Sequence, residues 1–227
     1  MVSENKNITT ENVLNDVWIL SHVHGGAKSH GVTTKEKYLR DVKLLKEELD
    51  KNPNDTRSQF YLAQSYRDAL MPKEALEEYK KRINMGGWKE ELFYSYYQVG
   101  KLMIQLNYSF GEVFPVFMKA YETDSRRLEP IYYLIDVCCR QKKYHLGYLL
   151  GKGIYNIRST NALLFVDKWV YNYAMLDVFS VCSYWAGDYK TALECAKILL
   201  REKKMPEHYI QRIKDNMKFC VDKLNKN

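Results

Sequence analysis

The sequence is poor in residues that break secondary structure. Its 227 residues include only 11 Gly and 5 Pro. A β-sandwich or barrel needs many tight turns, and those turns consume Gly and Pro. Long apolar runs are missing as well, since no stretch approaches the roughly 20 residues that cross a bilayer. We therefore expect neither an all-β domain nor a membrane-spanning protein.

Cysteine motifs are also missing. The five cysteines show no C-x-x-C spacing, and their odd number rules out complete pairing. They are Cys138, Cys139, Cys182, Cys195 and Cys220. Residues 1–11 are polar and lack the apolar stretch of a secretory signal. We expect buried, reduced thiols rather than disulfides or a zinc site.

A strong charge of one sign is absent. The chain has 35 Lys and Arg against 28 Asp and Glu, so 35 − 28 = +7. Most charges are mixed, as in residues 43–48, where Lys and Glu interleave as on a solvated helix face. Residues 201–227 carry eight Lys or Arg and four acids, without a recognition motif beside them. We predict no nucleic-acid partner.

Catalytic motifs are absent too. The chain has no Asp-x-Asp, no His-Glu-x-x-His, no glycine-rich phosphate loop and no nucleophile elbow. His22 and His24 alternate along one strand face, with His30 nearby, but they lack a carboxylate or thiolate partner. We therefore predict no catalytic residue, no cofactor and no metal, and only these histidines stand as candidate metal ligands. His145 and His208 read as surface residues on helices.

What the sequence does contain is helical periodicity from residue 34 onward. Thr33 or Thr34 can cap a first helix that stops at residues 52–54, Asn-Pro-Asn. Residues 1–33 differ, because Val17–Leu20 is a short apolar run of strand type before Gly25-Gly26. We expect an N-terminal extension over residues 1–33 and a helical domain over residues 34–227.

A repeat of helical hairpins begins at Thr56. Leu62, Ala63, Tyr66, Ala75 and Tyr79 occupy the large, small and aromatic positions of the 34-residue tetratricopeptide (TPR) unit. Small residues let the two helices of a hairpin approach closely, while large ones fill the groove between hairpins.

The pattern recurs three times, and residues 99, 134 and 179 take the position that Leu62 holds in the first unit. The small residues of these later units are Gly100 and Ala120, Gly147, and Ala192 and Ala196. The longest interval contains an insertion near Ser159–Asp167, and an amphipathic helix over Glu207–Leu224 reads as the terminal cap. The predicted fold is all-α, a TPR-like right-handed superhelix of helical hairpins with a short N-terminal strand and loop.

The most distinctive segment, Arg82–Glu91, has two interpretations. Gly86-Gly87 can end one helix in a left-handed cap, Trp88 can cover the junction, and Glu90 and Glu91 suit the first turn of the next helix. This structural interpretation is favoured over a recognition surface. For Arg67-Asp68 and for Arg126-Arg127 with Glu129, ion pairs between hairpins are favoured over ligand contacts.

Tyrosine is abundant, with 19 residues, and its apolar body with a polar tip suits a surface that is part core and part contact. The stripe Phe93, Tyr94, Tyr96, Tyr97 covers a wide arc, for which core packing is favoured over an interface. The candidate interaction surface comprises Arg67, Asp68, Trp88, Glu90, Glu91, Tyr94, Tyr97, Arg126 and Glu129.

Three stretches carry a family resemblance. They are residues 60–68 (Phe-Tyr-Leu-Ala-Gln-Ser-Tyr-Arg-Asp), residues 79–82 (Tyr-Lys-Lys-Arg) and residues 86–91 (Gly-Gly-Trp-Lys-Glu-Glu). Together with looser stretches between about Val17 and Leu200, they resemble the C-terminal helical-repeat region of family-2 glycosyltransferases of bacteria and giant viruses. The resemblance implies that residues 1–33 are the end of a catalytic domain that is otherwise missing. It carries over no catalytic residue.

Three functional hypotheses follow. The leading one is a non-catalytic module that mediates dimerisation or binds an acceptor or another protein, located in the cytoplasm, or in the host cytoplasm if the chain is viral. The alternative is a nucleotide-sugar-dependent glycosyltransferase, or a subunit that completes one with a separate catalytic subunit. The third is a self-associating scaffold, for which a homodimer is expected.

Overall fold

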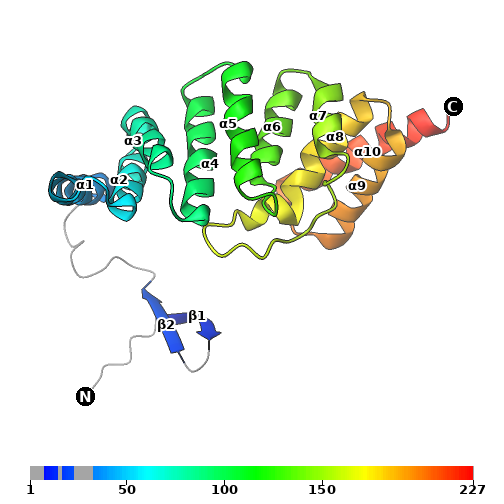
Figure 1. The fold of residues 1–227 in the computed structure, drawn as a ribbon. Helices are drawn as coiled ribbons and strands as arrows, with labels where there is room; N and C mark the ends of the chain where they lie inside the picture. Colours follow the sequence, from blue (N-terminus) through cyan, green and yellow to red (C-terminus); the bar gives the residue numbers. More distant parts are fainter. Residues whose placement is uncertain (1–7, 15–16, 23–32, 227) are drawn as a thin grey trace.

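The computed structural model describes residues 8–14, 17–22 and 33–226. Its helices stack side by side into a curved array, which confirms the predicted TPR-like helical superhelix (Figure 1). The helices are α1 (Thr34–Lys51), α2 (Thr56–Asp68), α3 (Pro72–Asn84), α4 (Lys89–Gln105), α5 (Phe110–Thr123), α6 (Glu129–Arg140), α7 (Tyr144–Gly151), α8 (Met175–Trp185), α9 (Tyr189–Glu202) and α10 (Ile210–Leu224). A π-helical turn, Val170–Ala174, leads into α8, and a 3-10 turn, Glu207–Tyr209, leads into α10.

Capping residues fix several of these boundaries. Thr33 and Glu36 form a reciprocal capping box at the start of α1, and Ser109 and Glu112 do the same for α5. Asp55 caps α2 by accepting hydrogen bonds from two backbone amides. These local signals place the helix starts close to where the sequence predicts them.

The helices form hairpins in which the first member is an A helix (α2, α4, α6, α8) and the second a B helix (α3, α5, α7, α9). Each helix packs against the next along the chain, and successive A helices also touch, as α4 does with α6. The predicted repeat positions Leu62, Ala63, Tyr66, Ala75 and Tyr79 are all buried. Burial of these residues confirms the repeat assignment for the first hairpin.

Two of the glycines lie at very close helix crossings. A Cβ atom at Gly100 would lie 2.6 Å from the Phe117 ring, and one at Gly147 would lie 2.4 Å from Cys182 Sγ. Atoms cannot approach so closely, so these positions require glycine for the helices to pack as they do. The role predicted for Gly147 is confirmed. The sequence pattern predicts a return helix over Tyr144–Tyr155 around Gly147, but this helix ends earlier, at Gly151, where Lys152 and Gly153 form a turn.

The C-terminal helix α10 closes the array. Ile213 and Cys220 are its buried residues, and Ile213 belongs to a second apolar cluster with Phe179 and Leu199. Most exposed residues of α10 are polar, which suits a terminal cap, although Phe219 and Val221 are exposed as well. The cap predicted over Glu207–Leu224 is confirmed.

Two strands precede the helical array. β2 (Val17–His22) is the predicted strand, and β1 (Ile8–Leu14) pairs with it in an antiparallel hairpin, with Ile8 opposite His22. β1 was not predicted, because its polar residues do not alternate clearly with apolar ones. His24 and His30 lie outside the described residues, so the candidate metal ligands stay untested.

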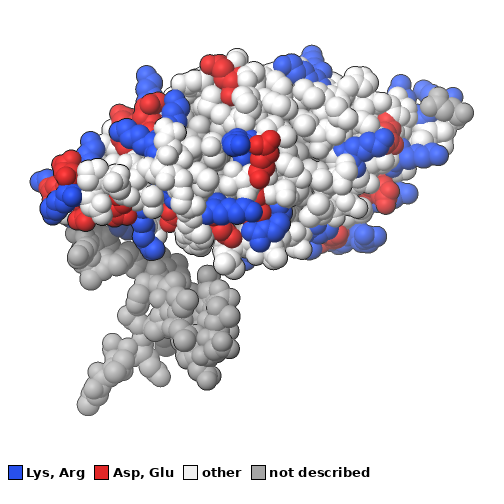
Figure 2. Space-filling model, viewed as in Figure 1, with Lys and Arg blue, Asp and Glu red and all other residues white. Residues whose placement is uncertain are grey.

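The five cysteines are free thiols, four of them buried and Cys139 half-buried, as predicted. His145 and His208 are exposed, also as predicted. None of the helices in the described part of the chain combines the length and apolar character needed to cross a membrane. Blue and red atoms intermix over the face drawn in Figure 2.

Candidate functional site

The insertion predicted near Ser159–Asp167 becomes part of the most elaborate polar cluster in the described part of the chain. We call residues 158–168 the inserted segment. It leaves α7, runs along the ends at which α4 and α6 begin, and returns to the π-helical turn before α8 (Figure 1). We call the side of the array where α2, α4 and α6 begin the A-helix edge.

A buried carboxylate on α4 holds the middle of the inserted segment. Glu90 Oε1 accepts a hydrogen bond from the backbone N–H of Leu163 at 3.2 Å, and Oε2 accepts one from Leu164 at 2.9 Å. A buried carboxylate is costly unless its oxygens are hydrogen-bonded. The two consecutive amides of the segment meet that requirement.

A fully buried arginine before α6 holds the next backbone groups. Arg127 donates to the carbonyl oxygens of Leu164 at 2.7 Å and Phe165 at 3.0 Å. It is paired with Glu129, from Nη2 to Oε1 at 2.7 Å, and its guanidinium lies over the Phe93 ring at 4.2 Å. Backbone carbonyls and a carboxylate therefore share this buried cation.

Glu129 completes the network. Besides Arg127, it accepts a hydrogen bond from the Tyr171 hydroxyl at 2.7 Å and a longer one from the backbone N–H of Asp167 at 3.4 Å. Tyr171 in turn accepts a hydrogen bond from the Leu128 amide. Burial raises the pKa of Tyr171 above its ordinary range, with the Glu129 charge adding to the effect. The phenol therefore stays protonated and keeps donating to the carboxylate.

The ring of Phe165 anchors the far end of the inserted segment. Its centroid lies 4.5 Å from that of Tyr94 and 6.1 Å from that of Phe60. Phe165 adopts a φ of 50° to make this turn, a left-handed conformation that few side chains other than Gly and Asn adopt freely. The aromatic contacts with α2 and α4 offset that strain.

Asp167 links the returning segment to the middle of α4. Its carboxylate accepts a hydrogen bond from the Tyr97 hydroxyl and lies 4.0 Å from Lys101 Nζ. Burial raises the pKa of Tyr97 well above its ordinary range and lowers that of Lys101. The Lys101 ammonium also lies over the Tyr97 and Tyr133 rings, at 5.0 and 5.6 Å.

Two further arginines stabilise neighbouring junctions. Arg67 pairs with Asp68 at 2.8 Å and donates to the Tyr94 hydroxyl at 2.9 Å, which links α2 to α4. Arg82, fully buried at the end of α3, bonds to Glu91 at 3.0 Å and to the carbonyl of Gly86. Gly86 and Gly87 have φ values of 66° and 90°, so the predicted left-handed helix end is confirmed.

The candidate surface predicted from sequence therefore divides into two groups. Glu90, Glu91, Tyr94, Tyr97 and Glu129 are buried and contact the chain itself. Arg67 and Asp68 are partly exposed, and Trp88 and Arg126 are exposed. Since Trp88 is half exposed, it covers the α3–α4 junction less than expected, and Arg82 closes that junction instead. Arg126 binds Asp124 at 2.6 Å and Asn161 at 3.3 Å.

Sequence reasoning missed Phe60, Arg82, Phe165 and Asp167 as members of this cluster. The enlarged spacing before residue 179 marks the insertion. No local pattern shows that the segment folds back onto α4 and α6.

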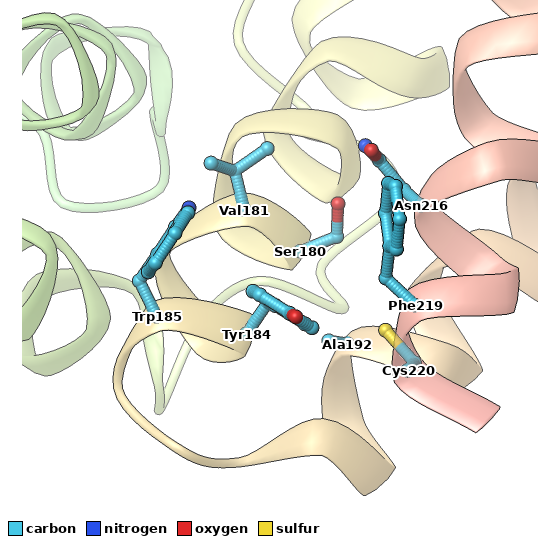
Figure 3. A pocket seen from close by; sticks show the side chains of 8 residues that line it. All are labelled: Ser180, Val181, Tyr184, Trp185, Ala192, Asn216, Phe219 and Cys220. Atoms are coloured by element: carbon cyan, nitrogen blue, oxygen red, sulfur yellow. The ribbon is translucent and has the colours of Figure 1, made fainter. Parts of the chain in front are cut away.

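A separate cavity opens between α8 and α10 (Figure 3). It has a volume of about 160 Å³ and no charged side chain in its lining. The lining residues are Ser180, Val181, Tyr184, Trp185, Ala192, Asn216, Phe219 and Cys220. Trp185 and Phe219 are each more than half exposed, so the cavity presents aromatic surface to solvent.

Among the described residues, no three His, Cys, Asp or Glu side chains converge as metal ligands. Cys139 Sγ and Cys182 Sγ lie 3.2 Å apart. Burial raises the pKa of the Cys138 thiol to about 11, and the hydrogen bond with Cys139, together with burial, raises that of Cys182 further. Cys138 and Cys182 therefore stay protonated and are poor nucleophiles at neutral pH.

Comparisons with known proteins support the fold. No protein-family model matches the chain, and no curated protein matches it. A solved structure of MamA aligns with a TM-score of 0.59 at 14% identity, covering 80% of this chain and 97% of that one. A second MamA structure aligns with a TM-score of 0.56 at 15% identity, covering 75% and 85%.

The solved structure of YrrB, a TPR protein with an unusual peptide-binding site, aligns with a TM-score of 0.55 at 14% identity. It covers 77% of this chain and 81% of that chain. These structures give no support to the glycosyltransferase resemblance. The chain is thus similar in fold to TPR-repeat proteins.

Proposed function

We propose that the chain is a helical-repeat interaction module that binds a segment of a partner protein. One observation carries the proposal: the A-helix edge holds an extended polypeptide through its backbone groups. Glu90 accepts from two consecutive amides, and Arg127 donates to two consecutive carbonyls. Because every polypeptide has these groups, the array has the chemistry for binding a peptide.

The protein comparisons agree with this proposal. YrrB has a similar fold and is described as having an unusual peptide-binding site. In this chain the inserted segment already occupies the edge over α4 and α6, so a partner would contact what remains exposed. The exposed candidates are the predicted residues Arg67, Asp68, Trp88 and Arg126, and the apolar cavity between α8 and α10.

Binding of synthetic peptides to the full chain tests this function. Short peptides selected by display from a random library should bind the folded chain in fluorescence anisotropy, and excess unlabelled peptide should compete. Light scattering in parallel should distinguish a partner-binding monomer from a homodimer. Failure to select any binding peptide, with a clean monomer in solution, would contradict an interaction role.

A second candidate is an accessory region of a glycosyltransferase, with residues 1–33 as the end of a catalytic domain. One observation favours it: Glu90, from the stretch 86–91, meets residues of two looser stretches that also resemble this family, 127–130 and 164–166, in the cluster that holds the inserted segment. The resemblance then reflects a shared structural arrangement. Calorimetric titration with UDP- and GDP-sugars and manganese tests it, since binding with transfer or hydrolysis would favour this candidate.

A further inference from the structure

Large apolar side chains are exposed along the A-helix edge. Their exposed fractions are 39% for Tyr61, 50% for Trp88, 82% for Leu163 and 42% for Phe165. Tyr61 comes from α2, Trp88 immediately precedes α4, and the other two belong to the inserted segment. Clustered exposed apolar groups with a polar rim are typical of protein-binding surfaces.

Contacts connect these side chains into one surface. The Phe60 ring lies 5.7 Å from the Tyr61 ring and 6.1 Å from the Phe165 ring. The Leu163 amide donates to Glu90, which sits in the helical turn that Trp88 begins. Tyr61, Trp88, Leu163 and Phe165 therefore lie along the same edge, from α2 to the start of α4, and we call them the apolar strip.

The exposed charges at the starts of α2, α4 and α6 are cations, whereas the acids there and in the inserted segment are buried or, for Asp55 and Asp167, half-buried. The acids Glu90, Glu91, Asp124 and Glu129 are all buried and paired with cations or backbone amides of the chain. The cations Arg57, Lys89 and Arg126 are all exposed. Elsewhere exposed charges are mixed, as on α3, where Lys80 and Lys81 pair with Glu77 and Glu78.

Two of these cations adjoin the apolar strip. Arg57 lies over the exposed Tyr61 ring at 5.5 Å, and Lys89 directly follows Trp88. Arg126, by contrast, is paired with Asp124 at 2.6 Å. An acidic partner gains from the charges of Arg57 and Lys89, and a basic partner is repelled by them.

We propose that this edge docks an acidic segment of a partner protein, with an aromatic or aliphatic side chain of that segment seated on Tyr61, Trp88, Leu163 and Phe165. The inference rests on the proposed function and names the partner's chemistry. The inserted segment has two roles in this docking. Its backbone groups bond to the buried charges of the edge, and its side chains Leu163 and Phe165 form part of the docking surface.

Three pools of short fluorescent peptides test the inference on the full chain. All pools carry Leu, Phe and Trp at fixed positions, and they differ only in whether the remaining residues are Asp and Glu, Lys and Arg, or Asn and Gln. We expect the acidic pool to bind most tightly, with an affinity that falls as salt is added. The other two pools should bind at least about tenfold more weakly.

Two surface variants locate the site. Leu163→Asp places a negative charge, of the same sign as the acidic peptides, in the apolar strip. Arg57→Glu with Lys89→Glu reverses the sign of the two charges beside the strip. Each should weaken binding of the acidic pool about tenfold or more. The matched controls are Leu149→Asp on α7 and Lys190→Glu with Lys197→Glu on α9, all at exposed positions, and these should change binding less than about twofold. Circular dichroism melting checks that every variant is folded.

The outcomes separate this inference from the proposed function. Equal binding of all pools, or acidic-pool binding that survives both edge variants, overturns the inference but leaves an interaction role. Binding lost on Phe219→Asp instead would assign the peptide to the cavity between α8 and α10. If no pool binds and library selection also fails, both proposals are overturned.

Discussion

The A-helix edge and the cavity between α8 and α10 differ in whether their side chains find bonding partners within the chain. At the A-helix edge, the buried charges Glu90, Arg127 and Glu129 all bond to the inserted segment. Between α8 and α10, the cavity around Trp185 and Phe219 has no charged lining and stays open. A buried charge without a partner costs far more than an exposed aromatic ring. The first region therefore requires partners from its own chain, whereas the second has no charged group that needs one.

The difference also explains how the two regions can serve binding. The buried polar groups of the A-helix edge already bond within the chain, so only its outer side chains are available to another protein. All the residues that line the cavity between α8 and α10 remain available for binding. Four measurements compare the two regions directly, beginning with the one that should have the largest effect.

Arg127→Ala should lower the free energy of unfolding by about 3–5 kcal/mol, because it leaves Glu129 buried without its cation. Urea unfolding followed by circular dichroism measures it. Arg57→Ala, at an exposed arginine of α2, should change stability by less than about 0.5 kcal/mol. The double variant Arg127→Met with Glu129→Leu should recover much of the loss, and a single-variant effect below about 1 kcal/mol would contradict the buried-pair account.

Glu90→Gln should cost about 1–3 kcal/mol, since the amide replaces one of two acceptor oxygens and leaves one backbone N–H of the inserted segment unsatisfied. Hydrogen exchange should show faster exchange at Leu163 and Leu164. The matched control is Glu77→Gln, an exposed residue on α3. Unchanged exchange at both amides would show that Glu90 does not hold the segment.

Stability at the edge should fall in alkali. Burial raises the pKa of Tyr97 above its ordinary range and that of Tyr133 to about 12, whereas an unfolded tyrosine ionises near about 10. As pH rises above about 10, the unfolded state loses these protons first, so the unfolding free energy drops by about 1.4 kcal/mol per pH unit for each such group. Urea unfolding at increasing pH measures the slope. Tyr97→Phe should flatten it, and an unchanged slope would contradict this assignment.

The smallest effect should come from the cavity. Phe219→Ser should change stability by no more than about 0.5 kcal/mol, because Phe219 is largely exposed. Thermal unfolding measures stability, and fluorescence of a small apolar dye reports occupation of the cavity. Dye binding should weaken while the melting curve stays in place. A large loss of stability would contradict the comparison, since Phe219 would then stabilise the fold as the buried residues of the A-helix edge do.

Much of the fold was predictable because its determinants are local. Thr33 caps α1 within one turn, and small residues such as Ala63 and Gly147 recur where hairpin helices cross. Each such signal depends on neighbouring residues or on the repeat spacing. The positions of the helices and of the insertion follow from them.

The site was predicted only in part, because its partners are distant in sequence. Glu90 and Glu91 were placed correctly in the first turn of α4, but the atoms that bury Glu90 lie more than seventy residues further on. Core packing was favoured for the Tyr94 and Tyr97 rings, and both are buried, but their partners Phe165 and Asp167 could not be predicted. No spacing rule connects a loop to the helices on which it folds back.

The reach of the inserted segment has a mechanical consequence. A solenoid normally bends like a spring, since each repeat touches only its neighbours. Here the inserted segment, which precedes the fourth hairpin, packs Phe165 against Phe60 of the first. It therefore acts as a brace across the hairpins α2–α3, α4–α5 and α6–α7. The braced part should hold its curvature under load, leaving flexure to the turns around α9 and α10.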